Sequence, residues 1–193
     1  EPGANSHIAC NEAYPRLSPL PCRTFEDCFT AVEKGDADLA MIPVENTIAG
    51  RVGDIHYLLP TTSLQIVGEH YLPIRFQLMG LPGVKLEDIR KARSHIMGLG
   101  QCRNFLRTHN IEPVTSADTA GAAREVTEGG DRSVAAIAPR LAAKVYGLDI
   151  LAEDIEDAAH NTTRFIIMAR EPSDIEAGQG PVKTAFLFEV RNI

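Results

Sequence analysis

The sequence predicts an α/β fold with largely parallel sheets, divided into two lobes. Short apolar runs typical of buried strands alternate with helical patterns over most of the chain. The long extended stretch at residues 64–81 has Pro73 near its middle, and proline cannot donate a backbone hydrogen bond inside a central strand. We therefore expect the chain to cross from one lobe to the other near Pro73.

The elements before this crossing have clear local signals. Thr24 and Asp27 have the spacing of a capping box, and Gly35 suits the C-terminal cap of the helix between them. Pro60 is expected to end a second helix, because proline breaks the helical hydrogen-bond ladder. The other two expected elements are a buried strand at residues 39–44 and that second helix, at residues 52–59.

The elements after the crossing repeat the alternation. Asp118 lies at the expected start of a helix that stops at Gly129, and Pro139 opens another helix that ends before Gly147. The remaining expected elements are a helix from Leu86, a helix at 97–109, and strands at 91–94, ending at Val114, at 134–138, at 150–151 and at 164–169.

Charge and hydropathy exclude several classes of partner. The chain has 193 residues, with 19 Lys and Arg against 26 Asp and Glu, and a formal charge of −7. An acidic chain repels nucleic acids and anionic membranes, so neither is an expected partner. No apolar run approaches the roughly 20 residues of a transmembrane helix, and no signal peptide is visible, so we expect a cytoplasmic protein.

Motifs for common cofactors are missing from the sequence. It contains no Gly-rich dinucleotide loop, no Walker A lysine loop and no zinc-protease motif. The four cysteines have no zinc-finger spacing, and reduced thiols are the main interpretation, with a catalytic cysteine as the minor one. No cofactor or metal is therefore expected.

Small polar side chains gather at four junctions between predicted elements, where α/β proteins bind ligands. The first is the Gly3 loop, which enters a helix through Ser6; its amides could hold a carboxylate, or it is an ordinary capped helix start. The second is Glu45, Asn46 and Thr47 directly after a buried strand. These residues either meet a ligand, or Asn46 or Thr47 caps a helix.

The other two junctions leave similar alternatives open. Ser94 and Gln101 could face one crevice, or Ser94 caps a helix and Gln101 is solvated. Arg164 heads a buried strand after Thr162 and Thr163, so its charge must pair with a carboxylate of a ligand or of the protein.

In their order along the chain, these segments resemble the prephenate dehydratase family, which makes phenylpyruvate for phenylalanine biosynthesis. The resemblance covers nearly the whole chain and departs from the family pattern at Asn5 and at residues 96–97. It rests on Pro2–Ser6, on Glu45-Asn46-Thr47 with Gly50, on Ser94-His95 with Gln101-Cys102, on Asp118-Thr119-Ala120, on Tyr146-Gly147-Leu148 and on Asn161-Thr162-Thr163-Arg164-Phe165.

The resemblance implies two α/β lobes flanking a cleft, like type II periplasmic binding proteins. Lobe 1 would comprise residues 1–74 and 160–172, and lobe 2 residues 75–159. A linker would follow at 173–182, and residues 183–193 would form the first strand of a truncated regulatory ACT domain. The resemblance also implies a further strand ahead of the Gly3 loop, so we expect the chain to be part of a longer protein.

By the same resemblance, prephenate loses carbon dioxide and hydroxide without a cofactor, and Thr163 donates a proton to the leaving group. The implied catalytic residues are Thr163, Arg164 and Phe165. The implied substrate-binding residues are Ser6, Glu45, Asn46, Thr47, Ser94 and Gln101. Glu45 is harder to place because a carboxylate repels a dianion, so we expect it to orient Asn46 or Arg164.

Two alternatives to this function stay open from the sequence. Arogenate dehydratase is the near neighbour within the enzymes, and a two-lobe domain that binds a small molecule without turnover is the other class. The implied partners are prephenate and L-phenylalanine, the latter as a feedback inhibitor through the missing ACT domain. A homodimer or homotetramer is expected from the family.

Overall fold

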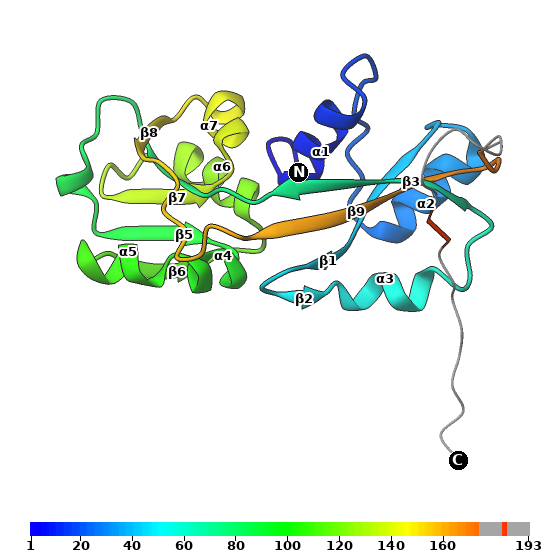
Figure 1. The fold of residues 1–193 in the computed structure, drawn as a ribbon. Coiled ribbons are helices and arrows are strands. Elements are labelled where there is room, and N and C mark those ends of the chain that lie inside the picture. Colours follow the sequence, from blue (N-terminus) through cyan, green and yellow to red (C-terminus); the bar gives the residue numbers. More distant parts are fainter. Residues whose placement is uncertain (174–182, 185–193) are drawn as a thin grey trace.

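The computed structural model describes residues 1–173 and 183–184 and contains two separate sheets, one in each lobe (Figure 1). The strand order is β2-β1-β9-β3 in the first lobe and β6-β5-β7-β4-β8 in the second. The expected two-lobe α/β fold is therefore confirmed. The predicted linker and ACT strand lie outside the described residues, apart from residues 173, 183 and 184.

The first lobe combines segments from both ends of the described chain, and the second lobe is inserted between them. The first lobe contains α1 (Asn5–Ala13), α2 (Phe25–Lys34), β1 (Ala40–Asn46), β2 (Gly50–Arg51), α3 (Gly53–Leu58), β3 (Gln65–Pro73) and β9 (Thr162–Ala169). The second contains β4 (Gln77–Gly80), the 3₁₀ helix η1 (Leu86–Asp88), β5 (Lys91–Ser94), α4 (Ile96–Gln101), α5 (Arg103–Thr108), β6 (Glu112–Thr115), α6 (Thr119–Gly129), β7 (Val134–Ala138), α7 (Arg140–Tyr146) and β8 (Asp149–Ala152).

The prediction of largely parallel sheets is wrong for the first lobe. There β9 returns from the second lobe, enters between β1 and β3, and pairs antiparallel with both. In the second lobe, β5 is parallel to β6 and β7, whereas β4 is antiparallel to β7 and β8. Alternation of helices and strands along the chain does not reveal a strand that returns from a distant segment.

The predicted crossing at Pro73 is confirmed. Strand β3 ends at Pro73, and β4 begins at Gln77 in the other sheet. Because β3 is an edge strand of its sheet, the missing backbone N–H group of Pro73 does not interrupt hydrogen bonding in the centre of the sheet.

The local helix signals were accurate at three termini. Thr24 and Asp27 form the predicted capping box, Gly35 adopts the left-handed conformation at φ 85°, and Asp118 accepts a hydrogen bond from the Gly121 amide. Each of these motifs depends only on residues within one helical turn.

The single helix predicted at residues 97–109 is wrong, because the chain breaks at Cys102 into α4 and α5. The backbone carbonyl of Gln101 accepts a hydrogen bond from the Asp157 amide at 2.6 Å. The Asp157 carboxylate in turn accepts from the Asn104 amide at 3.1 Å, at the start of α5. The chain segment that returns to the first lobe thus takes over hydrogen bonds that a continuous helix would make internally.

Helices cover both faces of the first sheet. On one face α2 and α3 pack an apolar cluster against Ile42, Ile166 and Met168. On the other face Ala9 of α1 packs against Phe165, in a cluster that continues into the second lobe. The lobes therefore share one apolar cluster that includes Ala9 of α1.

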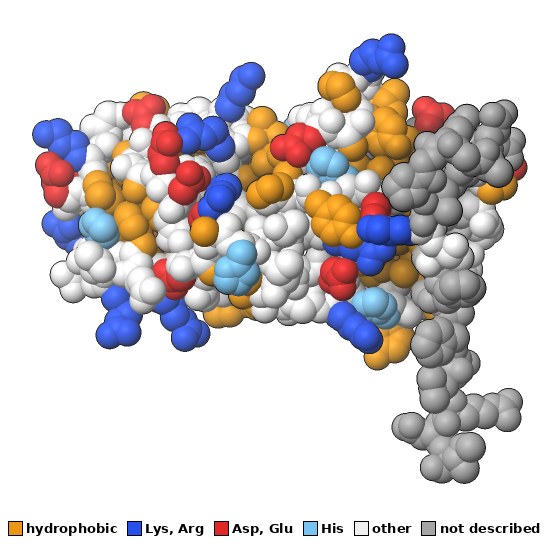
Figure 2. All heavy atoms as spheres, in the orientation of Figure 1, with side chains coloured by type: hydrophobic (Ala, Val, Ile, Leu, Met, Phe, Trp, Pro, Cys, Tyr) orange, Lys and Arg blue, Asp and Glu red, His pale blue; other side chains and the backbone are white. Residues whose placement is uncertain are grey.

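The surface carries charges of both signs. On the face drawn in Figure 2, Lys and Arg side chains are interspersed with Asp and Glu over both lobes. Within the described part of the chain, no helix has the length and apolar character to span a membrane.

Candidate active site

The turn between β1 and β2 is built around Asn46. The Asn46 Oδ1 atom accepts hydrogen bonds from the Ile48 and Ala49 amides, at 3.0 and 2.8 Å. The chain then continues into the short strand β2, so the alternative that Asn46 or Thr47 caps a helix is wrong. Both bonds to Oδ1 come from the backbone, and they fix the direction in which the Asn46 amide group points.

The amide nitrogen of Asn46 reaches the first residues of β9. Asn46 and Thr163 are register partners, and the Asn46 Nδ2 atom lies 3.0 Å from the Thr163 hydroxyl oxygen. It also lies 2.7 Å from Oδ1 of Asn161 and 3.2 Å from the Thr162 carbonyl. Thr163 is therefore a hydrogen-bond acceptor from Asn46, which leaves its own hydroxyl proton for another acceptor.

Asn161 extends this network into the second lobe. Its Nδ2 atom donates to Oε1 of Gln101, at the end of α4, over 2.7 Å. One hydrogen-bonded chain thus runs from Thr163 through Asn46 and Asn161 to Gln101, so the side-chain oxygen of Gln101 is bound within the protein rather than left to solvent. We call these four residues the amide network.

Thr47 secures the same turn to the segment before β9. Its hydroxyl donates to the His160 carbonyl and accepts from the Thr162 amide, both at 3.0 Å. Its own backbone amide donates to the Thr162 carbonyl. Thr47 therefore holds the backbone on which Thr163 is mounted.

Arg164 pairs with carboxylates of the protein. Its Nε atom lies 3.0 Å from Glu69, and its Nη1 atom lies 3.4 Å from Glu45. The expected link between Glu45 and Arg164 is therefore present. Hydrogen bonds from Lys183 and from Arg164 hold the pKa of Glu69 below its usual range, so Glu69 stays ionised beside Arg164.

The other predicted site residues lie in different surroundings. Phe165 is 1% exposed and belongs to the apolar core shared by the lobes. Ser94 is fully buried, and its hydroxyl donates to the Ile137 carbonyl at 2.7 Å, which ties β5 to β7. The alternative that Ser94 caps α4 is wrong, because the side chain of His95 accepts from the Met97 amide.

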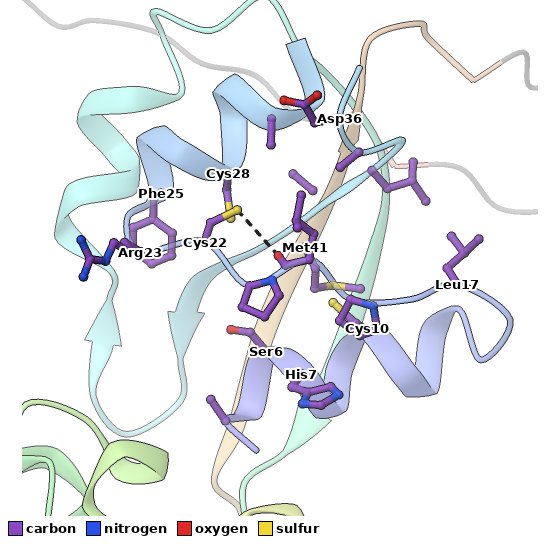
Figure 3. Close-up of a pocket in the computed structure, with 18 of the residues that line it drawn as sticks. Ser6, His7, Cys10, Leu17, Cys22, Arg23, Phe25, Cys28, Asp36 and Met41 are labelled. Atoms are coloured by element: carbon purple, nitrogen blue, oxygen red, sulfur yellow. Dashed lines mark hydrogen bonds between the residues drawn. The ribbon is translucent and has the colours of Figure 1, made fainter. Parts of the chain in front are cut away.

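Ser6 lies inside α1 and lines a cavity of about 790 Å³ (Figure 3). This cavity is enclosed by α1, the segment that follows it, α2 and β1, with Cys10 and Cys28 in its wall. None of the amide network lines it. The Gly3 amide, expected to be free for an anion, donates to the His7 ring instead.

A smaller cavity of about 290 Å³ lies between the lobes. Its wall includes Leu72 of β3, the register partner of Thr163, so it lies beside the edge strand that pairs with β9. Arg75 and Arg140 also line it and are paired with Glu156 and Glu153, at 2.6 and 2.8 Å. Nothing in the local sequence pattern distinguishes these two arginines from surface residues, so they were not among the predicted site residues.

Cys28 and Cys102 do not have the environment of a nucleophile. Burial raises the pKa of the Cys28 thiol to about 12, and burial also raises the pKa of Cys102. Both are therefore protonated at neutral pH, and the protonated thiol is a weak nucleophile. The four cysteines are free thiols in the structure, in agreement with the main interpretation of the sequence.

The comparison with protein families decides which family this architecture belongs to. The family model described as prephenate dehydratase matches residues 1–173. The chain belongs to the prephenate dehydratase family. Asn161 belongs to the amide network but was not among the predicted site residues. It is the first residue of the segment at 161–165 that resembles the family.

Individual prephenate dehydratase relatives agree with this assignment. The chain is 44% identical over 191 residues to the bifunctional N-acyl-homoserine lactone acylase/prephenate dehydratase of Komagataeibacter europaeus, covering 99% of this chain and 68% of that protein. It is 44% identical to arogenate dehydratase/prephenate dehydratase 1, chloroplastic, of Arabidopsis thaliana, covering 98% of this chain and 48% of that one.

A solved prephenate dehydratase from Arthrobacter aurescens, in complex with L-Phe, has the same fold. It matches 90% of this chain and 60% of its own length, with a TM-score of 0.81 and 32% identity. The chain thus spans between about half and two thirds of these relatives.

Proposed function

We propose that the chain is the catalytic unit of a prephenate dehydratase in phenylalanine biosynthesis. The ring carboxylate of prephenate leaves as carbon dioxide, and its electron pair moves into the ring. The ring hydroxyl leaves with a proton as water, and the product is phenylpyruvate. The observation that supports this proposal is the amide network, which connects the Thr163 hydroxyl through Asn46 and Asn161 to Gln101 of the other lobe, in a chain of this family.

Thr163 is the proton donor in this proposal. Its oxygen accepts from Asn46, so its proton is available to the hydroxide that leaves. A threonine hydroxyl is a weak acid, so its proton moves only as the carbon–oxygen bond breaks, and part of its effect is electrostatic. Aromatisation of the ring supplies the driving force, so a modest donor at the correct position suffices.

The substrate is a dianion, and the chain is acidic, so capture depends on local hydrogen-bond donors. We assign direct contact to Gln101 through its amide nitrogen. Asn46 orients Thr163 instead, because the protons of its own amide nitrogen are taken by Asn161, Thr162 and Thr163. Thr47 and Ser94 support the site through the backbone that they bind. Arg164 and Glu45 act as an oriented pair on the strands that carry Thr163 and Asn46.

Purified protein incubated with prephenate tests this proposal through the ultraviolet absorbance of phenylpyruvate. We expect turnover by the wild type and a kcat roughly 100- to 10,000-fold lower for Thr163→Ala, with a smaller change in KM. Thr163→Ser keeps the hydroxyl and should retain much of the activity. Saturable binding of prephenate without turnover would contradict this proposal and indicate a domain that binds the molecule without converting it.

A parallel assay with arogenate, followed through release of L-phenylalanine because its dehydration keeps the amine, sets the substrate preference. Arogenate carries an amine in place of the side-chain ketone, and plant relatives carry both substrate names. We propose prephenate as the preferred substrate, so its kcat/KM should exceed that of arogenate.

Regulation and assembly are part of the proposal. We propose a cytoplasmic enzyme that forms a homodimer or homotetramer and is inhibited by L-phenylalanine through an ACT domain beginning near residue 183. The L-Phe complex of the relative supports the ligand. Calorimetric titration of the full-length protein with L-phenylalanine tests this part.

A further inference from the structure

We infer that Asn161 is a positioning residue that sets the direction of the Gln101 amide and so supplies the site with a donor. The inference rests on the proposed function and deepens it. Asn161 is 1% exposed and touches neither cavity wall, so its role is to orient other side chains.

The backbone holds Asn161 firmly in place. It lies directly before β9, where the chain has just returned from the second lobe. Its carbonyl accepts from the Ile74 amide at 2.8 Å, in the segment that crosses in the other direction. The two crossings are therefore joined at the residue whose side chain joins the lobes.

The direction of each amide in the network follows from the turn after β1. Two backbone amides bind Oδ1 of Asn46, and a backbone amide can only donate. The other end of the Asn46 side chain must therefore be its NH₂ group. That NH₂ group requires an acceptor 2.7 Å away, so Asn161 must present its oxygen to Asn46.

The same reasoning continues to Gln101. Because the side-chain oxygen of Asn161 faces Asn46, its NH₂ group faces Gln101. This NH₂ group donates a hydrogen bond of 2.7 Å, so the Gln101 atom that accepts it must be the side-chain oxygen. The NH₂ group of Gln101 then points away from Asn161, and within the described residues it donates to no protein acceptor. The network thus presents two donors, the Gln101 amide and the Thr163 hydroxyl, and both suit an anion or a leaving hydroxide.

Asn161→Asp reverses one link of this chain. A carboxylate still accepts from Asn46, but it places an oxygen opposite Oε1 of Gln101, so Gln101 must turn its NH₂ group inward. The substrate then meets an oxygen in place of a donor. Losing a hydrogen bond to a charged group corresponds to roughly a 10- to 100-fold lower kcat/KM for prephenate near pH 8.

The pH profile separates orientation from simple damage. When the new carboxyl group is protonated, its O–H again donates to Gln101, so the variant should regain activity as the pH falls. We expect no such limb for the wild type, because kcat/KM reports ionisations of the free enzyme and free substrate, and the Asn161 amide does not ionise. The measurement covers pH 5.5 to 8.5, with the uncatalysed reaction subtracted and folding checked by circular dichroism.

Two further variants are the controls. Asn161→Ala removes both bonds and should lose activity with no recovery at low pH. Asn110→Asp makes the same chemical change at an exposed position and should follow the wild type. An Asn161→Asp variant within threefold of the wild type, or one whose loss is the same at every pH, overturns the inference. A wild type that does not turn over prephenate refutes the proposed function instead.

Discussion

Three consecutive residues at the start of β9 have three different surroundings. Thr163 accepts a hydrogen bond from Asn46, Arg164 pairs with two carboxylates, and Phe165 lies in the core. Successive side chains of a strand point to opposite faces of the sheet, so Thr163 and Phe165 share the face covered by α1. This short motif therefore combines the proposed proton donor with an ion-paired residue and a core residue.

Gly3 is a single residue on which the N-terminal loop depends. It has φ +86°, and a Cβ atom there would lie 2.8 Å from the Cα of Ala142 on α7. We expect Gly3→Ala to lower the free energy of unfolding by about 2 to 4 kcal/mol, from backbone strain and overpacking together. Urea denaturation followed by circular dichroism measures it.

The matched control for this substitution is Gly50→Ala. Gly50 has φ +81°, with nothing within 4 Å of the added Cβ, so it reports backbone strain alone. Equal losses at Gly3 and Gly50 would show that contact with α7 contributes nothing.

At the level of elements, β5 and β7 are joined by more than their ladder. The buried Ser94 hydroxyl donates to the Ile137 carbonyl, although backbone pairing of these strands ends at Arg93 and Ala136. The bond continues the contact between the two strands beyond their ladder, beneath the start of α4. Ser94 thus has a structural task that its place in the family motif does not reveal.

Ser94→Ala should therefore act mainly on stability. It leaves the buried Ile137 carbonyl without this donor, which costs about 1 to 3 kcal/mol in the free energy of unfolding. We expect kcat/KM for prephenate to stay within a few-fold of the wild type. The exposed Ser18→Ala should change stability by no more than about 0.5 kcal/mol. A large rise in KM with normal stability would instead place Ser94 in contact with the substrate.

The whole molecule is held together where its two crossings pair. Ile155 donates to the Phe76 carbonyl, and the Phe76 amide donates to the Glu156 carboxylate at 2.9 Å. The same carboxylate lies 2.6 Å from Arg75, and the Glu156 side chain is only 2% exposed. The two segments that cross between the lobes are thus hydrogen-bonded to each other and do not act as independent linkers.

Glu156→Ala should loosen this junction. It leaves the Phe76 amide and Arg75 without their acceptor, and we expect a loss of about 1 to 3 kcal/mol in the free energy of unfolding. Glu156→Gln keeps one acceptor oxygen and should lose less. Glu87→Ala is the control, because its contact with Lys85 is 3.9 Å long and exposed, and such pairs contribute about 0 to 1 kcal/mol. Equal stability of the Glu156 and Glu87 variants would contradict this account of the junction.

Local pattern alone determined much of this protein. The capping box at Thr24, the cap at Asp118, the crossing at Pro73 and the order of the motifs were all readable, because each depends on residues close together in sequence. The short polar segments were enough to identify the family and to point to Thr163 and Asn46.

Tertiary structure decided what those side chains bind. Asp157 breaks the helix before Asn104, which lies 53 residues earlier, and β9 makes the first sheet antiparallel by entering between β1 and β3. Asn46 meets Asn161 across 115 residues. Helical and strand periodicities report only on neighbours a few residues away. Hydrogen-bond partners that are 53 or 115 residues apart therefore depend on how the two lobes pack.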